Sequence, residues 1–322
     1  MLIDTHRHFG GCIPCEFVWE VVQENGFKHL GESLGDIRAA MQFLPDEPAN
    51  FHRFLDKFKI LDHIIWNEDL IDRSIQATCD GLEKEGVDFA WMRFSINKYM
   101  DAMNWHKHEA IEFIYDSFNA HRPGKVGLIL ALKYESMRAS QRQYASLIES
   151  PETAELLMGI DLVGDETYFD AQFYSSLFKQ WSKAGKVLCA HVGESQSAEN
   201  IRNAILQMGV KHVAHGIKIV QHMDILKLAK DRGICFDLAV TSNKVTGVWP
   251  NLSTHPIKDM LEYGLKVTIG TDDPVQCATT MDQEYAILKN EMKLSEESIQ
   301  TIKNNAIDST RAAWASTTNI NF

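Results

Sequence analysis

The sequence has no long hydrophobic run and no excess of positive charge. None of its apolar stretches approaches the roughly 20 residues of a membrane-spanning helix, and the N-terminal MLIDTHRHFGG lacks the basic start and apolar core of a signal peptide. Lys and Arg number 32 against 44 Asp and Glu, so the formal net charge is −12. Such a charge repels nucleic-acid phosphates and anionic membranes. We therefore expect a cytoplasmic protein without a nucleic-acid or membrane partner; no oligomeric state is predicted.

Cysteine is also scarce, with six residues in a chain of 322. The six are spread thinly and mostly lie in or beside apolar runs, which favours free thiols in a reducing compartment over a disulfide framework. Apolar residues make up 45% of the chain and charged residues 24%, which excludes a disordered, collagen-like or coiled-coil protein. The length allows one large domain or two ordinary ones.

Short apolar runs alternate with helix-patterned stretches about eight times along the chain. The runs span residues 2–5, 87–95, 125–132, 158–163, 186–192, 212–214, 234–240 and 265–270. Their β-branched composition and polar or glycine borders are typical of buried parallel strands. The pattern predicts an α/β protein with a (β/α)8 TIM barrel, and a doubly wound open sheet is the alternative. We expect one domain over 1–322, in which residues 12–86 form a mostly helical insertion after the first strand that could serve as a lid over one end of the barrel.

Histidines and carboxylates stand at the ends of four of the predicted strands. They are His6 and His8 after the first run, His191 and Glu194 after the fifth, His215 after the sixth, and Asp272 and Asp273 after the eighth. Residues two apart on a strand face the same side, so the two imidazoles of the first pair point one way. Because the active sites of such barrels gather at the carboxyl ends of the strands, we expect these side chains to meet.

Three imidazole nitrogens and one carboxylate oxygen are a donor set that suits zinc. The set would be His6, His8, His191 and Asp272, holding one ion per chain. A zinc-bound water can reach a pKa of about 7 and become a nucleophile at neutral pH. Glu194 and His215 remain available for proton transfer, and Asp273 for hydrogen bonding.

These motifs, in this order and spacing, resemble the adenosine deaminase family of metal-dependent hydrolases. The matching segments are His6-Arg7-His8, Asp161–Glu166, His191–Glu194, His215-Gly216, Ser242-Asn243 through Thr246-Gly247, His255-Pro256 and Thr271–Pro274. The likeness extends from the first residues to about Trp314. It implies an enzyme of purine and nucleotide metabolism that hydrolytically deaminates a 6-aminopurine nucleoside or derivative. A metal-bound water would attack C6 and ammonia would leave.

The resemblance also implies a role for each residue of the site. Zinc would be held by His6, His8, His191 and Asp272. His215 would position the attacking water and help to deprotonate it, with Asp272 sharing that task. Glu194 would protonate the ring nitrogen beside the attacked carbon. The backbone N–H of Gly164 and the side chain of Asp273 would bind the purine ring, and His8 would also touch the substrate.

The sequence departs from the family pattern at two glycines. Gly10 stands where nucleoside-directed members carry Asp and adenine-directed members tend to carry Glu. A glycine there leaves space for a larger, modified or phosphorylated group, so the substrate is a small purine whose exact form stays open. Gly270 replaces the asparagine that precedes Thr-Asp-Asp-Pro in the family.

Two other functions stay open beside deamination. The protein could instead be a metal-dependent barrel hydrolase that acts on an ester, a lactone or a cyclic amide. It could also be a non-catalytic homologue that binds purines without turnover. Glu194 favours the deaminase, because proton donation to a ring nitrogen is a need of deamination. Outside the site, Arg93 is interpreted as structural, paired with a carboxylate, and Cys12 and Cys15 as two cysteines near a helix start rather than a redox pair.

Overall fold

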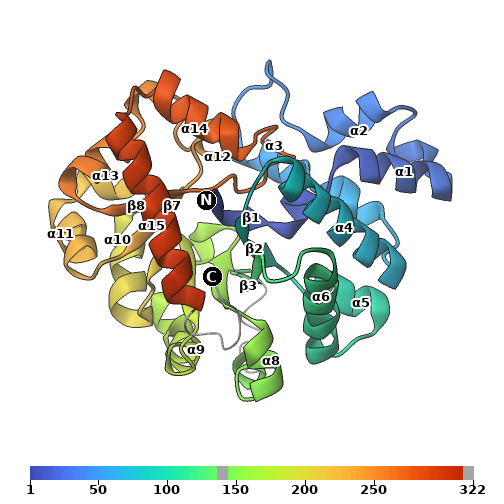
Figure 1. The fold of residues 1–322 in the computed structure, drawn as a ribbon, viewed down its shortest axis with the longest axis horizontal. Coiled ribbons are helices and arrows are strands. Elements are labelled where there is room, and N and C mark those ends of the chain that lie inside the picture. The colour runs from blue at the N-terminus through green and yellow to red at the C-terminus, as the bar shows by residue number, and fades with distance from the viewer. Residues whose placement is uncertain (136–143, 315–322) are drawn as a thin grey trace.

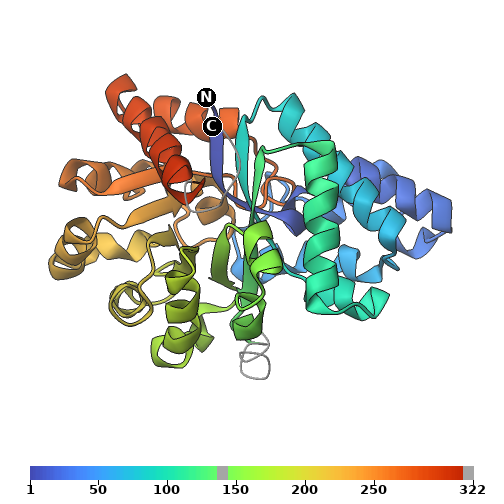
Figure 2. The ribbon, with the colours of Figure 1, turned by 60° about the horizontal axis from the view of Figure 1, so that its bottom comes forward.

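Eight parallel strands form the centre of the protein in a computed structural model that describes residues 1–135 and 144–314. The strands are β1 Ile3–His8, β2 Phe89–Phe94, β3 Val126–Lys133, β4 Gly159–Val163, β5 Val187–Val192, β6 His212–His215, β7 Cys235–Leu238 and β8 Lys266–Ile269. Each is hydrogen-bonded to the next in chain order, and helices surround them (Figures 1 and 2). A bridge between Arg7 and Asp272 joins the end of β8 to β1. The predicted (β/α)8 barrel is confirmed.

The surrounding helices range from 6 to 19 residues in length. They are α1 Cys15–Asn25, α2 Leu34–Met41, α3 Phe51–Asp56, α4 Glu68–Lys84, α5 Asn97–Met103, α6 Lys107–His121, α8 Pro151–Leu156, α9 Ala171–Lys183, α10 Ala198–Asn203, α11 Met223–Asp231, α12 Val240–Val245, α13 Ile257–Tyr263, α14 Met281–Asn290 and α15 Glu296–Trp314. The segment 12–86 contains α1 to α4, and in Figure 1 α1 and α2 lie on the far side of α4 from β8. A lid function for this segment stays a prediction. None of the described helices combines the length and apolarity that crossing a membrane requires.

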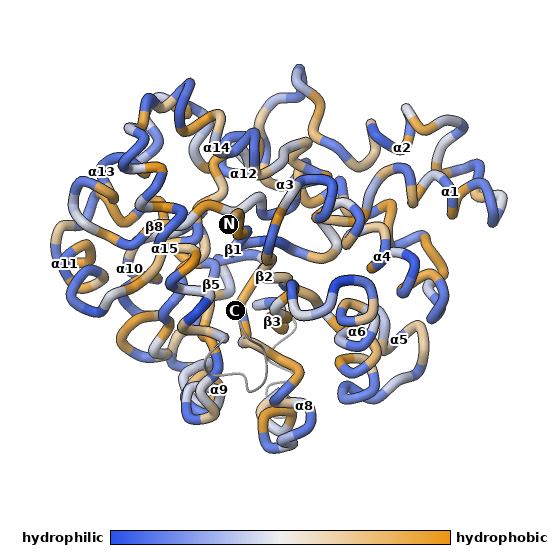
Figure 3. The backbone as a smooth tube through the Cα atoms, viewed as in Figure 1, coloured by the Kyte–Doolittle hydropathy of each residue, from blue (hydrophilic) through white to orange (hydrophobic). Residues whose placement is uncertain are grey.

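The helices are amphipathic and pack one apolar face on the barrel, as α9 illustrates. Asp170 caps its start by accepting a hydrogen bond from the Phe173 N–H. Tyr174, Phe178 and Trp181 lie at helical spacing and are buried. Fully burying an aromatic side chain of this kind contributes ~2–3 kcal/mol of hydrophobic free energy. Figure 3 shows the result as helices along which hydrophilic and hydrophobic segments alternate.

A buried arginine links three strands inside the barrel. Arg93 Nε on β2 donates to Asp161 Oδ2 on β4 at 2.6 Å, and Nη1 donates to the carbonyl of Thr5 on β1 at 2.8 Å. Nη2 lies 3.7 Å from Asp237 Oδ2 on β7. The structure therefore confirms that Arg93 pairs with carboxylates, and it places this pairing beneath the strand ends.

We expect Arg93→Lys to lower the free energy of unfolding by about 2 kcal/mol, because one ammonium group cannot replace a planar fork with several donors. Urea unfolding of metal-loaded protein measures the change. A matched exposed substitution, Arg311→Lys on the outer face of α15, should change it by less than about 0.5 kcal/mol. An equally small effect of Arg93→Lys would contradict the prediction.

Candidate active site

The closure of the barrel brings Asp272 between the two histidines of β1. The His8 N–H donates to the carbonyl of Asp272 at 2.9 Å, and the Asp272 N–H donates to the carbonyl of His6 at 2.7 Å. Asp272 has a left-handed backbone with φ +60°, as does His215. Such a conformation in a residue other than glycine costs of order 1–3 kcal/mol and occurs often at functional sites. Two candidate site residues thus carry backbone strain that the surrounding structure holds in place.

Four predicted metal ligands converge on one point at the carboxyl ends of the strands. His6 Nε2 lies 3.3 Å from His8 Nε2, 3.1 Å from His191 Nε2 and 3.2 Å from Asp272 Oδ1. His8 Nε2 lies 3.2 Å from both His191 Nε2 and Asp272 Oδ1. A tetrahedron with such edges has its centre about 2.0 Å from each corner, which is the zinc–nitrogen distance in proteins.

The chemistry of these atoms also fits a cation. Three imidazole nitrogens this close to one another cannot all share hydrogen bonds, since each neutral ring has one proton to donate. A metal ion at their centre would satisfy all of them at once. His6, His191 and Asp272 are buried, and His215 offers a further nitrogen within 4.8 Å of the ligand atoms of these three.

Outer partners fix the orientation of the candidate ligands. His6 Nδ1 lies 3.3 Å from the carbonyl of Asp237, and His191 Nδ1 lies 3.1 Å from Asp161 Oδ1. A carbonyl or carboxylate on the second ring nitrogen is the usual support of a metal-binding histidine. Burial alone would lower the pKa of His191, but the negative charge of Asp161 outweighs it and raises that pKa.

A chain of hydrogen bonds determines which nitrogen of His215 carries the proton. The N–H of Ile257 donates to His255 Nδ1 at 3.3 Å, so the neutral His255 ring donates from Nε2 to Asn243 Oδ1 at 3.1 Å. Asn243 Nδ2 then donates to His215 Nδ1 at 3.0 Å. Burial lowers the pKa of His255 to about 4 and that of His215 well below its usual range. Neutral His215 therefore carries its proton on Nε2.

That proton faces the centre of the site. His215 Nε2 lies 3.7 Å from Glu194 Oε1 and 3.8 Å from Asp272 Oδ2. Asp272 Oδ2 in turn accepts a hydrogen bond from the Ser242 hydroxyl at 2.7 Å. The space between these three side chains is therefore bordered by one N–H donor and two carboxyl groups.

The carboxyl groups of the site have opposite protonation states. Burial, together with the charge of Asp272, raises the pKa of Glu194 to about 8 and the pKa of Asp273 well above its usual range. Burial also acts to raise the pKa of Asp272, but the charge of His6 and hydrogen bonds from the imidazoles lower it well below its usual range. At neutral pH, Glu194 and Asp273 are therefore protonated acids beside an ionised Asp272.

Asp273 and Gly164 are the predicted purine-binding residues. Asp273 Oδ1 is buried and has no hydrogen-bond partner among the described residues, so it is free for a ligand. Gly164 has φ +97°, and a Cβ atom there would lie 2.8 Å from Glu135 Oε2. The left-handed backbone favours glycine at this position, immediately after β4.

The two glycines that depart from the family pattern differ in their surroundings. A Cβ atom on Gly10 would have only Phe58 Cδ1 near it, at 4.0 Å. On Gly270 it would lie 2.5 Å from the Cβ of His6 and 2.8 Å from Asp4 Oδ1. Gly10 therefore leaves open space, whereas Gly270 allows β1 and the end of β8 to approach closely.

The six cysteines are free and buried, as expected for a chain without disulfides. Cys15 begins α1 and Cys12 ends the turn before it. Burial raises the pKa of Cys15 to about 11 and raises that of Cys12 further. Both are therefore protonated thiols, which fits the structural interpretation of this pair.

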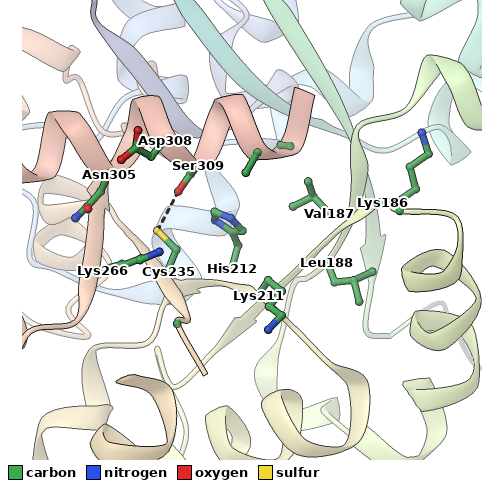
Figure 4. A pocket seen from close by; sticks show the side chains of 14 residues that line it. Lys186, Val187, Leu188, Lys211, His212, Cys235, Lys266, Asn305, Asp308 and Ser309 are labelled. Atoms are coloured by element: carbon green, nitrogen blue, oxygen red, sulfur yellow. Dashed lines mark hydrogen bonds between the residues drawn. The ribbon is translucent and has the colours of Figure 1, made fainter. Parts of the chain in front are cut away.

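A second group of possible ligands lies deeper, toward the opposite end of the barrel. His212, Cys235 and Asp237 place ligand atoms within 4.8 Å of one another, and Figure 4 shows the first two beside a pocket of about 330 Å³. Burial lowers the pKa of His212, but the Asp237 carboxylate 3.2 Å away outweighs it and raises that pKa to about 10. This group is therefore an imidazolium–carboxylate pair, and we do not assign it a metal.

Several supporting residues have no role in the sequence prediction. Asp161, Ser242, Asn243 and His255 occur in the motifs that carry the family resemblance, and each contacts a candidate site residue directly or through one neighbour. Their place in those motifs was the one signal that pointed to them. Asp237, which holds His6 through its carbonyl, lies in an ordinary apolar run and had no such signal.

Comparison with known proteins agrees with this geometry. The sequence model of the family described as "Adenosine deaminase" matches residues 2–320. The adenosine deaminase of Pseudoalteromonas translucida is 25% identical over 311 residues, covering 95% of this chain and 92% of that protein. Among solved structures, the fold resembles adenine deaminase from Arthrobacter aurescens, with a TM-score of 0.82, 19% identity and coverage of 98% and 96% of the two chains.

The N6-methyl-AMP deaminase of Arabidopsis thaliana has the same fold. Its TM-score is 0.79, with 16% identity and coverage of 98% of this chain and 95% of that chain. Because the family match spans nearly the whole sequence, the resemblance in the motifs is confirmed. The chain belongs to the adenosine deaminase family.

Proposed function

We propose that this protein is a zinc-dependent enzyme that hydrolytically deaminates a 6-aminopurine or a derivative of one. The observation that carries the proposal is the buried carboxyl of Glu194, 3.7 Å from His215 Nε2 and beside a site for a cation. Burial and the charge of Asp272 raise the pKa of Glu194 to about 8, so this carboxyl can act as a general acid at neutral pH. A buried acid next to a nucleophile is what addition of water to a ring C–N double bond requires.

One zinc ion held by His6, His8, His191 and Asp272 would supply a water molecule acidified to a nucleophile at neutral pH. Asp272 Oδ2 takes the proton of the attacking water. His215 donates its Nε2–H to the oxygen of that water and so positions it. The hydrogen-bond chain through Asn243 and His255 favours this positioning role, because Nδ1 of His215 is already occupied as an acceptor. Its help in deprotonation stays a prediction.

Glu194 gives its proton to the ring nitrogen beside C6 while the water oxygen bonds to that carbon. The carbon then carries both the new hydroxyl and the amino group. Asp272 passes the proton that it took from the water to the amino group, the bond from C6 to that nitrogen breaks, and ammonia leaves. The hydroxyl proton returns to Glu194, and the 6-oxopurine remains. Protonated Asp273 donates to the five-membered ring, and the N–H of Gly164 binds another ring nitrogen. These contacts place C6 against the water and hold the ring plane fixed.

The other two functions differ in what they ask of Glu194. Ester or lactone hydrolysis needs an acid at a leaving oxygen. It does not need an acid at a nitrogen of a ring that Gly164 and Asp273 hold in place. A non-catalytic protein needs no acid. The test is a screen of zinc-loaded protein for ammonia release from adenine, adenosine and AMP, and for methylamine release from their N6-methyl forms. Release of either amine supports the proposal. Ester turnover without amine release, or tight purine binding without turnover at full metal occupancy, overturns it.

The substrate is inferred to carry a group larger than a bare purine ring. The relatives named above act, by their names, on adenine, adenosine and N6-methyl-AMP, so family membership leaves a base, a nucleoside and a nucleotide open. At Gly10 no side chain fills the space near Phe58. A phosphorylated or otherwise enlarged substituent therefore meets neither an acidic residue nor a bulky one at this position.

We expect Gly10→Asp to lower kcat/KM for AMP relative to adenosine by about tenfold or more, because a new carboxylate repels phosphate through a low dielectric. Gly10→Asn is the matched control, since it adds nearly the same volume without charge. Steady-state kinetics on both substrates measure the ratio. An unchanged ratio in the Asp variant would show that the substituent of the purine does not lie near position 10.

A further inference from the structure

A buried glutamate lies behind the loop that carries Glu194. Glu166 begins the 3-10 helix Glu166–Tyr168, two residues after Gly164, and its side chain is buried. The motifs assign it no role. Glu166 lies outside the candidate cation site. It contacts the loop after β5, residues 193–196.

Six hydrogen bonds converge on its two carboxylate oxygens. Oε1 accepts from the Gly193 N–H at 2.5 Å and from Asn200 Nδ2 at 2.9 Å. The donors to Oε2 are the N–H groups of Glu194, Ser195 and Gln196, at 3.2, 3.0 and 2.9 Å, and the Ser195 hydroxyl at 3.4 Å. Four consecutive N–H groups thus point at one anion, an arrangement known as a backbone nest.

The loop depends on this anion for its shape. Gly193 opens the nest with φ +67°, and a Cβ atom there would lie 2.4 Å from Ile201 Cδ1, so the backbone turns where no side chain fits. Gly193 and Glu194 are buried, whereas Ser195 and Gln196 are exposed. A buried N–H without an acceptor is costly, so the first two groups depend most on Glu166. A different partner for all four would require a different loop conformation.

The nest lies immediately behind the proposed proton donor. The N–H of Glu194 is one of the four groups that Glu166 holds, while the carboxyl of Glu194 extends from the same residue to within 3.7 Å of His215 Nε2. The charge of Glu166 also contributes, after burial and the charge of Asp272, to the raised pKa of Glu194. Backbone position and acidity of the donor are therefore both linked to one side chain.

We propose that Glu166 is a positioning residue, whose carboxylate holds residues 193–196 so that the Glu194 carboxyl faces the reacting ring. The inference rests on the proposed function, in which Glu194 protonates the substrate. Glu166 does not touch the substrate itself. It acts through the loop, in a role distinct from those of the predicted metal ligands and purine-binding residues.

The main test is Glu166→Gln in zinc-loaded protein. In either amide orientation an NH₂ group replaces one oxygen and faces at least two donors, so the loop must move. We expect kcat to fall about 30- to 100-fold, the loss that a misplacement of about 1 Å produces, with KM changed less than about threefold and zinc content unchanged. Removing the negative charge lowers the pKa of Glu194, so the decline of kcat at alkaline pH should begin at lower pH.

Amide hydrogen exchange of residues 193–196 tests the same inference without activity. We expect exchange there to quicken at least tenfold in Glu166→Gln. Thr310→Val is the matched control, because it removes the buried hydrogen bond that Trp91 Nε1 donates at 2.9 Å far from the loop. It should lower Tm while leaving loop exchange, kcat and the pH profile unchanged. If Glu166→Gln behaves like this control, the inference is wrong.

A rescue variant identifies the contact itself. Adding Asn200→Asp to Glu166→Gln gives the new amide an acceptor and restores the lost charge, so part of the kcat should return, whereas Asn200→Asp alone should lower it. If Glu166→Gln does not fold, the Asn200→Ala variant tests the inference instead, because it removes one of the hydrogen bonds to Glu166. We expect its kcat to fall three- to tenfold. An unchanged kcat would overturn the inference. Wild-type protein that releases neither ammonia nor methylamine from the screened purines would defeat the proposed function, while loop exchange would still decide the role of Glu166.

Discussion

Glu194→Gln is expected to reduce kcat for ammonia release by about a thousandfold, within the range that a positioned general acid contributes. Glutamine preserves the shape of the side chain but has no acidic proton to give to the ring nitrogen. The buried position that raises the pKa of Glu194 to about 8 shields the site from bulk water, which limits replacement of the donor by solvent. Steady-state kinetics on the best substrate of the screen measure the loss.

The matched control for this substitution is Glu199→Gln. Glu199 lies five residues further on, is exposed and pairs with Arg202 on the outer surface of α10. It should keep wild-type kcat, and both variants should retain about one zinc per chain. Activity of Glu194→Gln within tenfold of wild type would show that another group protonates the purine, and the proposed mechanism would be abandoned.

Removal of the metal should abolish activity, with a loss of at least a thousandfold that zinc restores. Without the cation, three imidazole nitrogens and a carboxylate oxygen remain 3.1–3.3 Å apart with nothing to acidify the water. The protein should also become less stable, because a ligand at 1,000 times its Kd stabilises the folded state by ~4 kcal/mol. Dialysis against a chelator, metal analysis, ammonia assays and thermal unfolding measure these changes.

Two histidine variants make the result specific to the site. His191→Ala should contain less than about a tenth of a zinc ion per chain, since it removes one of four ligands. His29→Ala, at an exposed position, should bind metal as wild type does. Full activity in protein stripped of metal would contradict both the donor set and the proposed function. A content of two ions per chain would instead point to the group around His212.

The fold was predictable because parallel strands in a barrel are buried on both faces. Many of the strands then appear as largely apolar runs, as Val126–Lys133 does, and such runs are followed by amphipathic helices such as Ala171–Lys183. Histidines and aspartates at the ends of such runs stand out against this background. Their gathering at one end of the barrel follows from the fold class.

The supporting residues were less predictable, because their roles come from contacts between distant segments. Glu166 lies 27 residues from the N–H of Gly193 that it holds, and no local pattern connects the two. His255 affects His215 only through the side chain of Asn243. In each case a partner from another loop defines what the residue does.

The types and order of the chemical groups were determined by the sequence alone. Strand periodicity predicted that His6 and His8 face one side, and the motifs predicted which residues would join them. The tertiary structure decided protonation and orientation, namely a protonated Glu194 beside an ionised Asp272, and His215 with its proton on Nε2. These properties depend on desolvation and on the nearest charges and donors, which exist only once the chain has brought separate strand ends together.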